Sequence, residues 1–159
     1  MTLRTVDWKD NSVIMIDQTK LPIELVFVKY TDYNDVAQAI RTLVVRGAPA
    51  IGVSGAFGMA LAALQSKSET KEGLLSDLEK AKKTLFETRP TAVNLSWGLE
   101  TIMEIAKQGN SISDIRESVI NKAKQMADDD VQTNKEMGKN GAELFHNNDT
   151  IMTHCNAGA

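Results

Sequence analysis

The sequence is poor in cysteine and in aromatic side chains. It has one cysteine, Cys155, in 159 residues, and aromatic residues amount to 5% of the chain. A single cysteine excludes an internal disulfide and is typical of a protein from a reducing compartment. The first eight residues, MTLRTVDW, lack the apolar run of a signal peptide. We therefore expect a cytoplasmic protein.

The sequence also lacks a large excess of charge of one sign and an apolar run long enough to cross a membrane. The formal net charge is -3, which argues against the extended basic surface of a nucleic-acid-binding protein. The stretch from Ala48 to Leu64 has no charged residue. It nevertheless falls short of the ~20 apolar residues that cross a membrane, and it contains glycine and serine. The sequence predicts a buried core helix over this stretch. For the whole protein, it predicts neither nucleic acid nor a membrane as a partner.

The most informative stretch runs from Arg46 to Gly52 and reads RGAPAIG. Pro49 suits the first turn of a helix because it has a fixed φ and no N–H, so a helix should begin within a residue of Ala48. Gly47 would let an anion approach the N–H groups of that turn, and the Arg46 guanidinium can hold two phosphate oxygens. Alternatively, Gly52 and the glycines after it only allow close helix packing. Both interpretations stay open, and they do not exclude each other.

Hydrophobic periodicity predicts an α+β domain in which a small antiparallel β-structure precedes a helical bundle. Two β-rich runs, 13–16 and 23–28, flank a polar connection and indicate an antiparallel hairpin. Trp8 is expected to pack on this small sheet. Apolar residues at helical spacing predict helices over 32–45, 48–65, 74–86, 91–109 and 111–145.

An arginine and a run of aspartates on these helices are candidates for a functional role. Arg89 precedes Pro90 and therefore lies at a helix end, where it either complements the helix dipole or supplies a second arm to a phosphate. The three aspartates at 128–130 are consecutive on a predicted helix. Because consecutive helical side chains point in different directions, they indicate a solvated face and not a metal site.

The last residues predict the beginning of another domain. Residues 150–155 have the pattern of a strand, and the loop 156–159 that follows contains glycine. An α/β unit opens in this way, with its ligand crevice at the carboxyl end of the strand. Cys155 stands at that end, as a small buried residue or as a catalytic thiol. Because a strand without a neighbour is not a finished sheet, we expect the front part of a longer polypeptide.

Segments spread over the whole chain carry a resemblance to a known family. They read TVDW with IDQTKLP, VRGAPAIG, TRPTAVNL and THCNAGA. Together they resemble the 5-methylthioribose-1-phosphate isomerases of methionine salvage. That family shares a superfamily with ribose-1,5-bisphosphate isomerase and with the regulatory subunits of the eukaryotic initiation factor 2B complex.

The resemblance implies an aldose-ketose isomerase that converts 5-methylthioribose 1-phosphate to 5-methylthioribulose 1-phosphate. It assigns the catalytic thiol to Cys155 and substrate binding to Arg46, Gly47, Ala48 and Arg89. It implies no cofactor and no metal, and a homodimer as the full-length protein. The acidic catalytic partner of the family has no counterpart among these residues, so this chain alone is expected to be an inactive fragment.

The resemblance also divides the chain into three parts. A small β-structure at 1–30 and a helical part at 31–147 would form the amino-terminal domain, and 148–159 would be the first strand and loop of a truncated Rossmann-like domain. Two alternatives stay open: a ribose-1,5-bisphosphate isomerase, or a non-catalytic regulatory subunit of the initiation-factor-2B type that binds a sugar or nucleotide phosphate. The joint presence of Arg46, Arg89 and Cys155 favours the enzyme.

Overall fold

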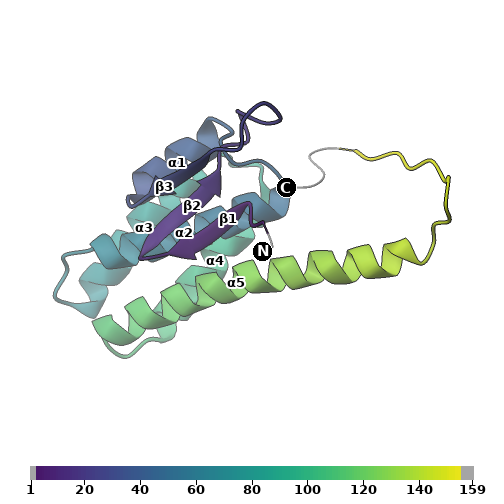
Figure 1. Ribbon diagram of the computed structural model, residues 1–159. Helices are drawn as coiled ribbons and strands as arrows, with labels where there is room; N and C mark the ends of the chain where they lie inside the picture. The colour runs from purple at the N-terminus through teal and green to yellow at the C-terminus, as the bar shows by residue number, and fades with distance from the viewer. Residues whose placement is uncertain (1–2, 155–159) are drawn as a thin grey trace.

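The computed structural model describes residues 3–154, which form a small antiparallel sheet beside a group of helices (Figure 1). The strands are β1 (Val6–Lys9), β2 (Ser12–Ile16) and β3 (Phe27–Tyr30). The helices are α1 (Tyr33–Arg41), α2 (Ala48–Gln65), α3 (Lys71–Phe86), α4 (Val93–Gln108) and α5 (Ile112–Ala142). The predicted order of a small sheet before a helical bundle is confirmed.

The strand β2 lies in the centre of the sheet and pairs antiparallel with both neighbours. Its pairing with β3 confirms the predicted hairpin, but β3 begins at Phe27 and not at residue 23. The reason is local: the N–H groups of Ile23 and Glu24 both donate to the Lys20 carbonyl, so these residues continue the turn. Ile23 is accordingly 89% exposed.

The strand β1 is an addition to the predicted hairpin. It is joined to β2 by a two-residue turn at Asp10 and Asn11, both of which have positive φ. Such turns match the twist of the strands they connect. Trp8 of β1 packs towards the helices, with its ring centroid 5.5 Å from that of Phe57. Trp8 is thus a packing residue, but it belongs to the sheet itself and packs on α2, where the sequence predicted that it would pack on the sheet.

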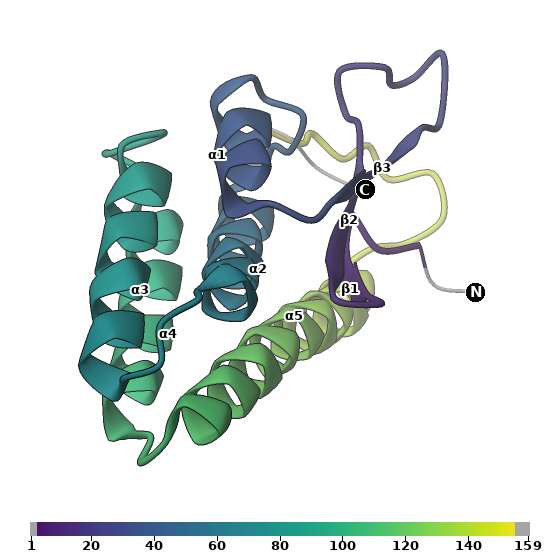
Figure 2. The same cartoon turned by 90° about the vertical axis from the view of Figure 1, so that its left-hand side faces the viewer.

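The helix α2 is the centre of the fold, with α1, α3, α4 and α5 all packed against it (Figure 2). Every residue from Ile51 to Ala63 is buried. Its length of 18 residues and mean hydropathy of 1.4 would suit a membrane span. However, most of the helix is buried inside the fold, as expected for the predicted core helix. Strand residues such as Val13 and Met15 share the same core.

Glycine allows α2 and α4 to touch backbone to backbone. A Cβ on Gly52 would lie 2.8 Å from the Asn94 carbonyl oxygen, and one on Gly98 would lie 2.7 Å from the Gly52 carbonyl oxygen. Separations below 3.0 Å require the neighbouring backbone to move. The predicted packing role of Gly52 is thus confirmed, and it holds the beginnings of α2 and α4 side by side.

Short connections make successive helices run in opposite directions, which gives the helical layer two distinct ends. At one end, called the capped end here, α1, α3 and α5 begin next to the last residue of α2: Gln65 Oε1 accepts from the Tyr33 N–H at 3.4 Å. At the other, the open end, α2 and α4 begin after Gly47 and Ala92. Every helix that starts at the capped end has a side-chain cap, supplied by Asp32, Thr70 and Ser111.

The helix α5 is much longer than the others and projects from the fold (Figure 1). From Gln132 to Asn140 all its residues are exposed. Residues 150–154 follow as irregular chain, because no strand within the described range 3–154 pairs with them. The strand predicted at 150–155 is therefore absent from the described residues. A strand needs partners, so the Rossmann-like domain stays a prediction.

Candidate functional site

A cleft of about 580 Å³ lies at the open end, between the chain before β1, the start of α2 and the second half of α5. Its described lining consists of Leu3, Arg4, Thr5, Val6, Gln18, Arg46, Gly47, Pro49, Ala50, Val53, Ala127, Asp130, Val131, Asn134 and Lys135. A volume of this size fits a small organic ligand. Two of the predicted site residues, Arg46 and Gly47, thus line the same cleft.

The Arg46 side chain is held by the loop that follows β2. Its backbone N–H donates to Gln18 Oε1 at 2.9 Å, and its Nη2 donates to the Gln18 carbonyl. The Gln18 N–H in turn donates to the Val44 carbonyl at 2.9 Å. The guanidinium is therefore positioned before any ligand binds. Its Nε atom is buried and makes no hydrogen bond to the described residues.

The turn before α2 depends on glycine. Gly47 has φ 96° and ψ 129°, a left-handed conformation that residues with a Cβ rarely adopt. It is the N-cap residue, and no side chain among residues 3–154 caps this helix end. The first N–H groups of a helix have no partner within the helix, so those of Ala48 and Ala50 are available to a ligand. This geometry is what the anion-site interpretation requires.

A second uncapped helix end lies next to the first. Ala92 is the N-cap residue of α4 and cannot supply a side-chain acceptor. Because Asn94 touches Gly52, the start of α4 and the start of α2 are neighbours. Arg89, half-buried, lies in the turn before α4, where its carbonyl accepts from the Ala92 N–H at 3.0 Å. Arg89 thus belongs to the open end, although it is not among the residues that line the cleft.

The cleft also contains groups that the sequence patterns did not assign to it. Asp128 and Asp129 are exposed, as predicted, but Asp130 is half-buried and lines the cleft together with Asn134. Burial raises the pKa of Asp130, and a hydrogen bond from Asn134 partly opposes that shift. The spacing could have shown this: Asp130 follows the buried Ala127 by three residues and so continues the inner face of α5.

Cys155 lies outside the described residues, so its predicted role as the catalytic thiol stays a prediction. Within residues 3–154, His, Cys, Asp and Glu do not gather in groups of three or more that could hold a metal ion. The polar groups of the described site are therefore two arginines, uncapped helix N–H groups, the Gln18 amide, and a carboxylate, an amide and a lysine on α5. These groups bind anions and hydroxyls.

The chain is similar to known proteins in sequence and in fold. The sequence model of the Initiation factor 2 subunit family matches residues 44–159. Methylthioribose-1-phosphate isomerase of Trichlorobacter lovleyi is 46% identical over 99% of this chain and 46% of its own length. The isomerase of Petrotoga mobilis is 45% identical over 98% of this chain and 46% of its own length. The chain spans about half the length of these curated relatives.

Two solved structures have the same fold. The crystal structure of 5-methylthioribose 1-phosphate isomerase from Pyrococcus horikoshii OT3 is similar with a TM-score of 0.86 and 43% identity, over 91% of this chain and 41% of that one. The structure described as translation initiation factor eIF-2B, subunit delta, from A. fulgidus has a TM-score of 0.86 and 40% identity, over 93% of this chain and 43% of that one. The resemblance carried by the sequence segments is confirmed, and the chain belongs to the Initiation factor 2 subunit family.

Proposed function

We propose that this chain is the phosphate-binding part of a methylthioribose-1-phosphate isomerase of methionine salvage, acting in the cytoplasm as a homodimer. The observation that carries the proposal is the cleft in which Arg46 meets the uncapped start of α2. A sugar phosphate supplies the anion that such a helix end and guanidinium bind. The relatives that share 42% to 46% of its residues bear the name of this enzyme.

The chemical problem of such an isomerase explains why a separate phosphate site is useful. Phosphate on C1 prevents the sugar from opening to a free aldehyde, so the ring must be opened by protonation of its oxygen. A proton then moves from C2 to C1, which we assign to the Cys155 thiolate, with hydride transfer as the competing mechanism. Phosphate binding at the open end would fix C1 and C2 relative to this thiol, and fixed orientation lowers the barrier of such a step.

The second candidate is a non-catalytic subunit that binds a sugar or nucleotide phosphate. The similarity to the structure described as an eIF-2B delta subunit favours it, because that protein shares 40% of the aligned residues. Both candidates use the same cleft. They differ in whether a bound sugar phosphate is turned over.

The deciding experiment is turnover of 5-methylthioribose 1-phosphate by the full-length protein, meaning this chain together with the remaining length that its relatives have. We expect isomerisation by that protein and none by residues 1–159 alone. In the full-length protein, Cys155→Ser should lower kcat by at least about a hundredfold, the low end for a positioned base, with little change in substrate binding. Binding without turnover would select the regulatory subunit, and near-native kcat in the variant would select hydride transfer.

A further inference from the structure

The wall of the cleft that α5 contributes differs in chemistry from the wall at Arg46. It presents a half-buried carboxylate, Asp130, and an exposed amide, Asn134, one helical turn apart, with the exposed Lys135 next to the amide. Residues four apart on a helix face the same direction. The cleft thus has an arginine and helix N–H groups on one side, and on the other a carboxylate and an amide beside a lysine.

The hydrogen bonds within this pair show what it offers to a ligand. Asn134 Nδ2 donates to the Asp130 carbonyl at 2.8 Å and to Asp130 Oδ1 at 3.2 Å. Both amide hydrogens are therefore occupied, and an ionised carboxylate has no hydrogen to donate. What remains is Asn134 Oδ1 and the other lone pairs of Asp130. The pair is a set of acceptors.

The oxygens of Asp130 and Asn134 accept hydrogen bonds from donors, and the negative charge of Asp130 by itself disfavours phosphate. Asp130 makes no ion pair within 4.0 Å to any described residue, although Arg46 and Lys135 line the same cleft. Its carboxylate is half-buried, and this burial raises its pKa. Desolvated acceptors are stabilised by hydrogen-bond donors that replace the lost water. Sugar hydroxyls are such donors, and each can donate one hydrogen bond.

We propose that Asp130 and Asn134 form a hydroxyl-binding subsite, which receives the sugar of a sugar phosphate whose phosphate lies at Arg46 and Gly47. This inference rests on the proposed function of the cleft as a sugar-phosphate site. It assigns to α5 the distinction between a sugar phosphate and a bare phosphate ion. The start of α2, in contrast, recognises only the anion.

The test compares two probes by calorimetry on the full-length protein: inorganic phosphate and ribose 1-phosphate, which adds only the sugar. Wild type should bind ribose 1-phosphate at least tenfold more tightly than inorganic phosphate. Asp130→Ala should reduce that preference at least tenfold without weakening the binding of inorganic phosphate. Asn134→Ala should reduce the preference severalfold. Asp129→Ala is the matched control, because it removes the same charge from an exposed position beside the cleft wall and should leave the preference unchanged.

Two results would overturn the subsite: an unchanged preference in both Asp130→Ala and Asn134→Ala, or an equal loss of affinity for both probes. Circular dichroism of each variant separates these results from misfolding, and alanine favours the helix at either position. Turnover of 5-methylthioribose 1-phosphate by the same wild-type preparation reports on the proposed function separately. If the variants lose the preference for ribose 1-phosphate and the wild type has no turnover, the subsite is supported and the isomerase is rejected. If the wild type has turnover and the variants keep the preference, the isomerase is supported and the subsite is rejected.

Discussion

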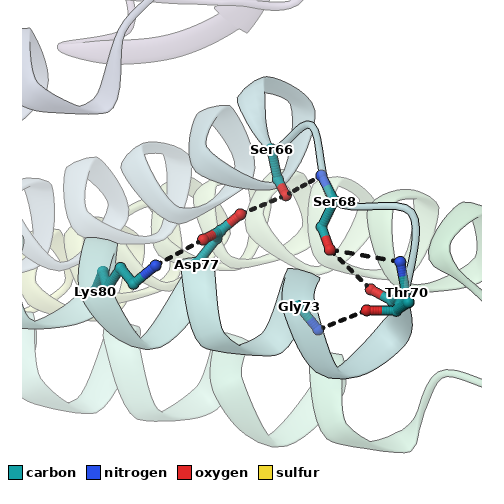
Figure 3. A network of polar contacts seen from close by, with 6 residues as sticks. All are labelled: Ser66, Ser68, Thr70, Gly73, Asp77 and Lys80. Carbon is teal, nitrogen blue, oxygen red and sulfur yellow. Dashed lines mark hydrogen bonds and ion pairs between the residues drawn. The ribbon is translucent and has the colours of Figure 1, made fainter.

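The two ends of the helical layer satisfy their helix N-termini in opposite ways. At the capped end, Thr70 Oγ1 accepts from the Gly73 N–H at 3.1 Å, and Ser68 and Ser66 link this cap to Asp77 of α3 (Figure 3). At the open end, Gly47 and Ala92 have no side-chain acceptor to offer. A side-chain cap stabilises a helix by about 0.5–2 kcal/mol relative to alanine.

This difference shows at which helix N-termini a bound ligand could add stability. At the capped end, one N–H group at the start of each of α1, α3 and α5 already has the N-cap side chain as its partner. The open end has two neighbouring helix starts without such partners, each preceded by an arginine. An anion bound there would act as the cap that the sequence omits.

The largest expected effect separates two arginines, one at each end. Arg46 donates to the Gln18 carbonyl at the open end, and Arg116 donates to the carbonyls of Ala63 and Ser66 near the capped end, at 2.9 and 2.6 Å. In the full-length protein, Arg46→Ala should weaken binding of inorganic phosphate by about ten- to a hundredfold, the range expected for charge-assisted hydrogen bonds. Calorimetric titration measures this.

Arg116→Ala is the control for lost backbone anchoring. It should lower stability but leave the dissociation constant for phosphate unchanged. Arg89→Ala should also weaken phosphate binding, and less than additively with Arg46→Ala if both arginines hold one anion. Equal phosphate affinity in the Arg46→Ala and Arg116→Ala variants would show that the open end is not the anion site.

The next effect concerns the contact that holds the open end together. Gly52→Ala places a methyl group 2.8 Å from the Asn94 carbonyl oxygen, so the backbones of α2 and α4 must separate. We expect destabilisation of about 1–3 kcal/mol, the usual range for overpacking, in urea unfolding of the chain. Gly138→Ala is the control, because nothing lies within 4 Å of its Cβ position, and it should stabilise the helix by about 0.5–1 kcal/mol. The same sign for both variants would contradict the backbone contact.

Local chemistry explains which parts of this fold are predictable from sequence. The start of α2 at Ala48 follows from Gly47 and Pro49. The sequence narrows the caps of α1 and α5 to Thr31 or Asp32 and to Ser111 or Ser113, and the structure selects Asp32 and Ser111. The cleft-lining pair of Arg46 and Gly47, which we propose as an anion site, is also visible in the sequence, because both residues adjoin the predicted start of α2.

Long-range arrangement explains what is not predictable. The bond between Arg46 and Gln18 joins residues 28 positions apart, and no local pattern encodes it. The three-residue spacing from Ala127 places Asp130 on the same face of α5, but the sequence does not show that a cleft lies against that face, which depends on the start of α2 and the chain before β1. The strand predicted at 150–155 illustrates the same limit, because β-propensity forms a strand only where another strand is available.

A smaller effect should distinguish the two ends. A change of helix cap should alter both stability and phosphate binding at the open end, but only stability at the capped end. Ala92→Asp gives α4 a side-chain cap, so it should stabilise the chain by about 0.5–2 kcal/mol in thermal unfolding. The new carboxylate would compete with an anion for the same N–H groups, so phosphate should bind more weakly. Thr70→Ala at the capped end should destabilise by a similar amount and leave phosphate binding unchanged. Tighter phosphate binding by Ala92→Asp would refute the idea that a ligand caps the open end.

The smallest effect tests the capped end by pH. Hydrogen bonds from Ser66 and Lys80 lower the pKa of Asp77 below its ordinary value. A carboxyl group with a lowered folded-state pKa contributes stability at pH values above its unfolded-state pKa, and this contribution is lost as pH falls through the folded-state pKa. Asp77→Asn should therefore be less stable than wild type at neutral pH, by less than about 1 kcal/mol because the site is solvated.

The pH course distinguishes this carboxylate network from simple packing around Asp77. The stability difference between wild type and Asp77→Asn should stay constant from pH 7 to about pH 5 and shrink as pH falls below about 4, where carboxyl groups become protonated. Asp129→Asn removes an exposed carboxylate that has no hydrogen bond to a described residue, so it should show little difference at any pH. A loss of stability in Asp77→Asn that persists unchanged to pH 2 would mean that packing, and not the charged hydrogen-bond network of Figure 3, stabilises this end of the helical layer.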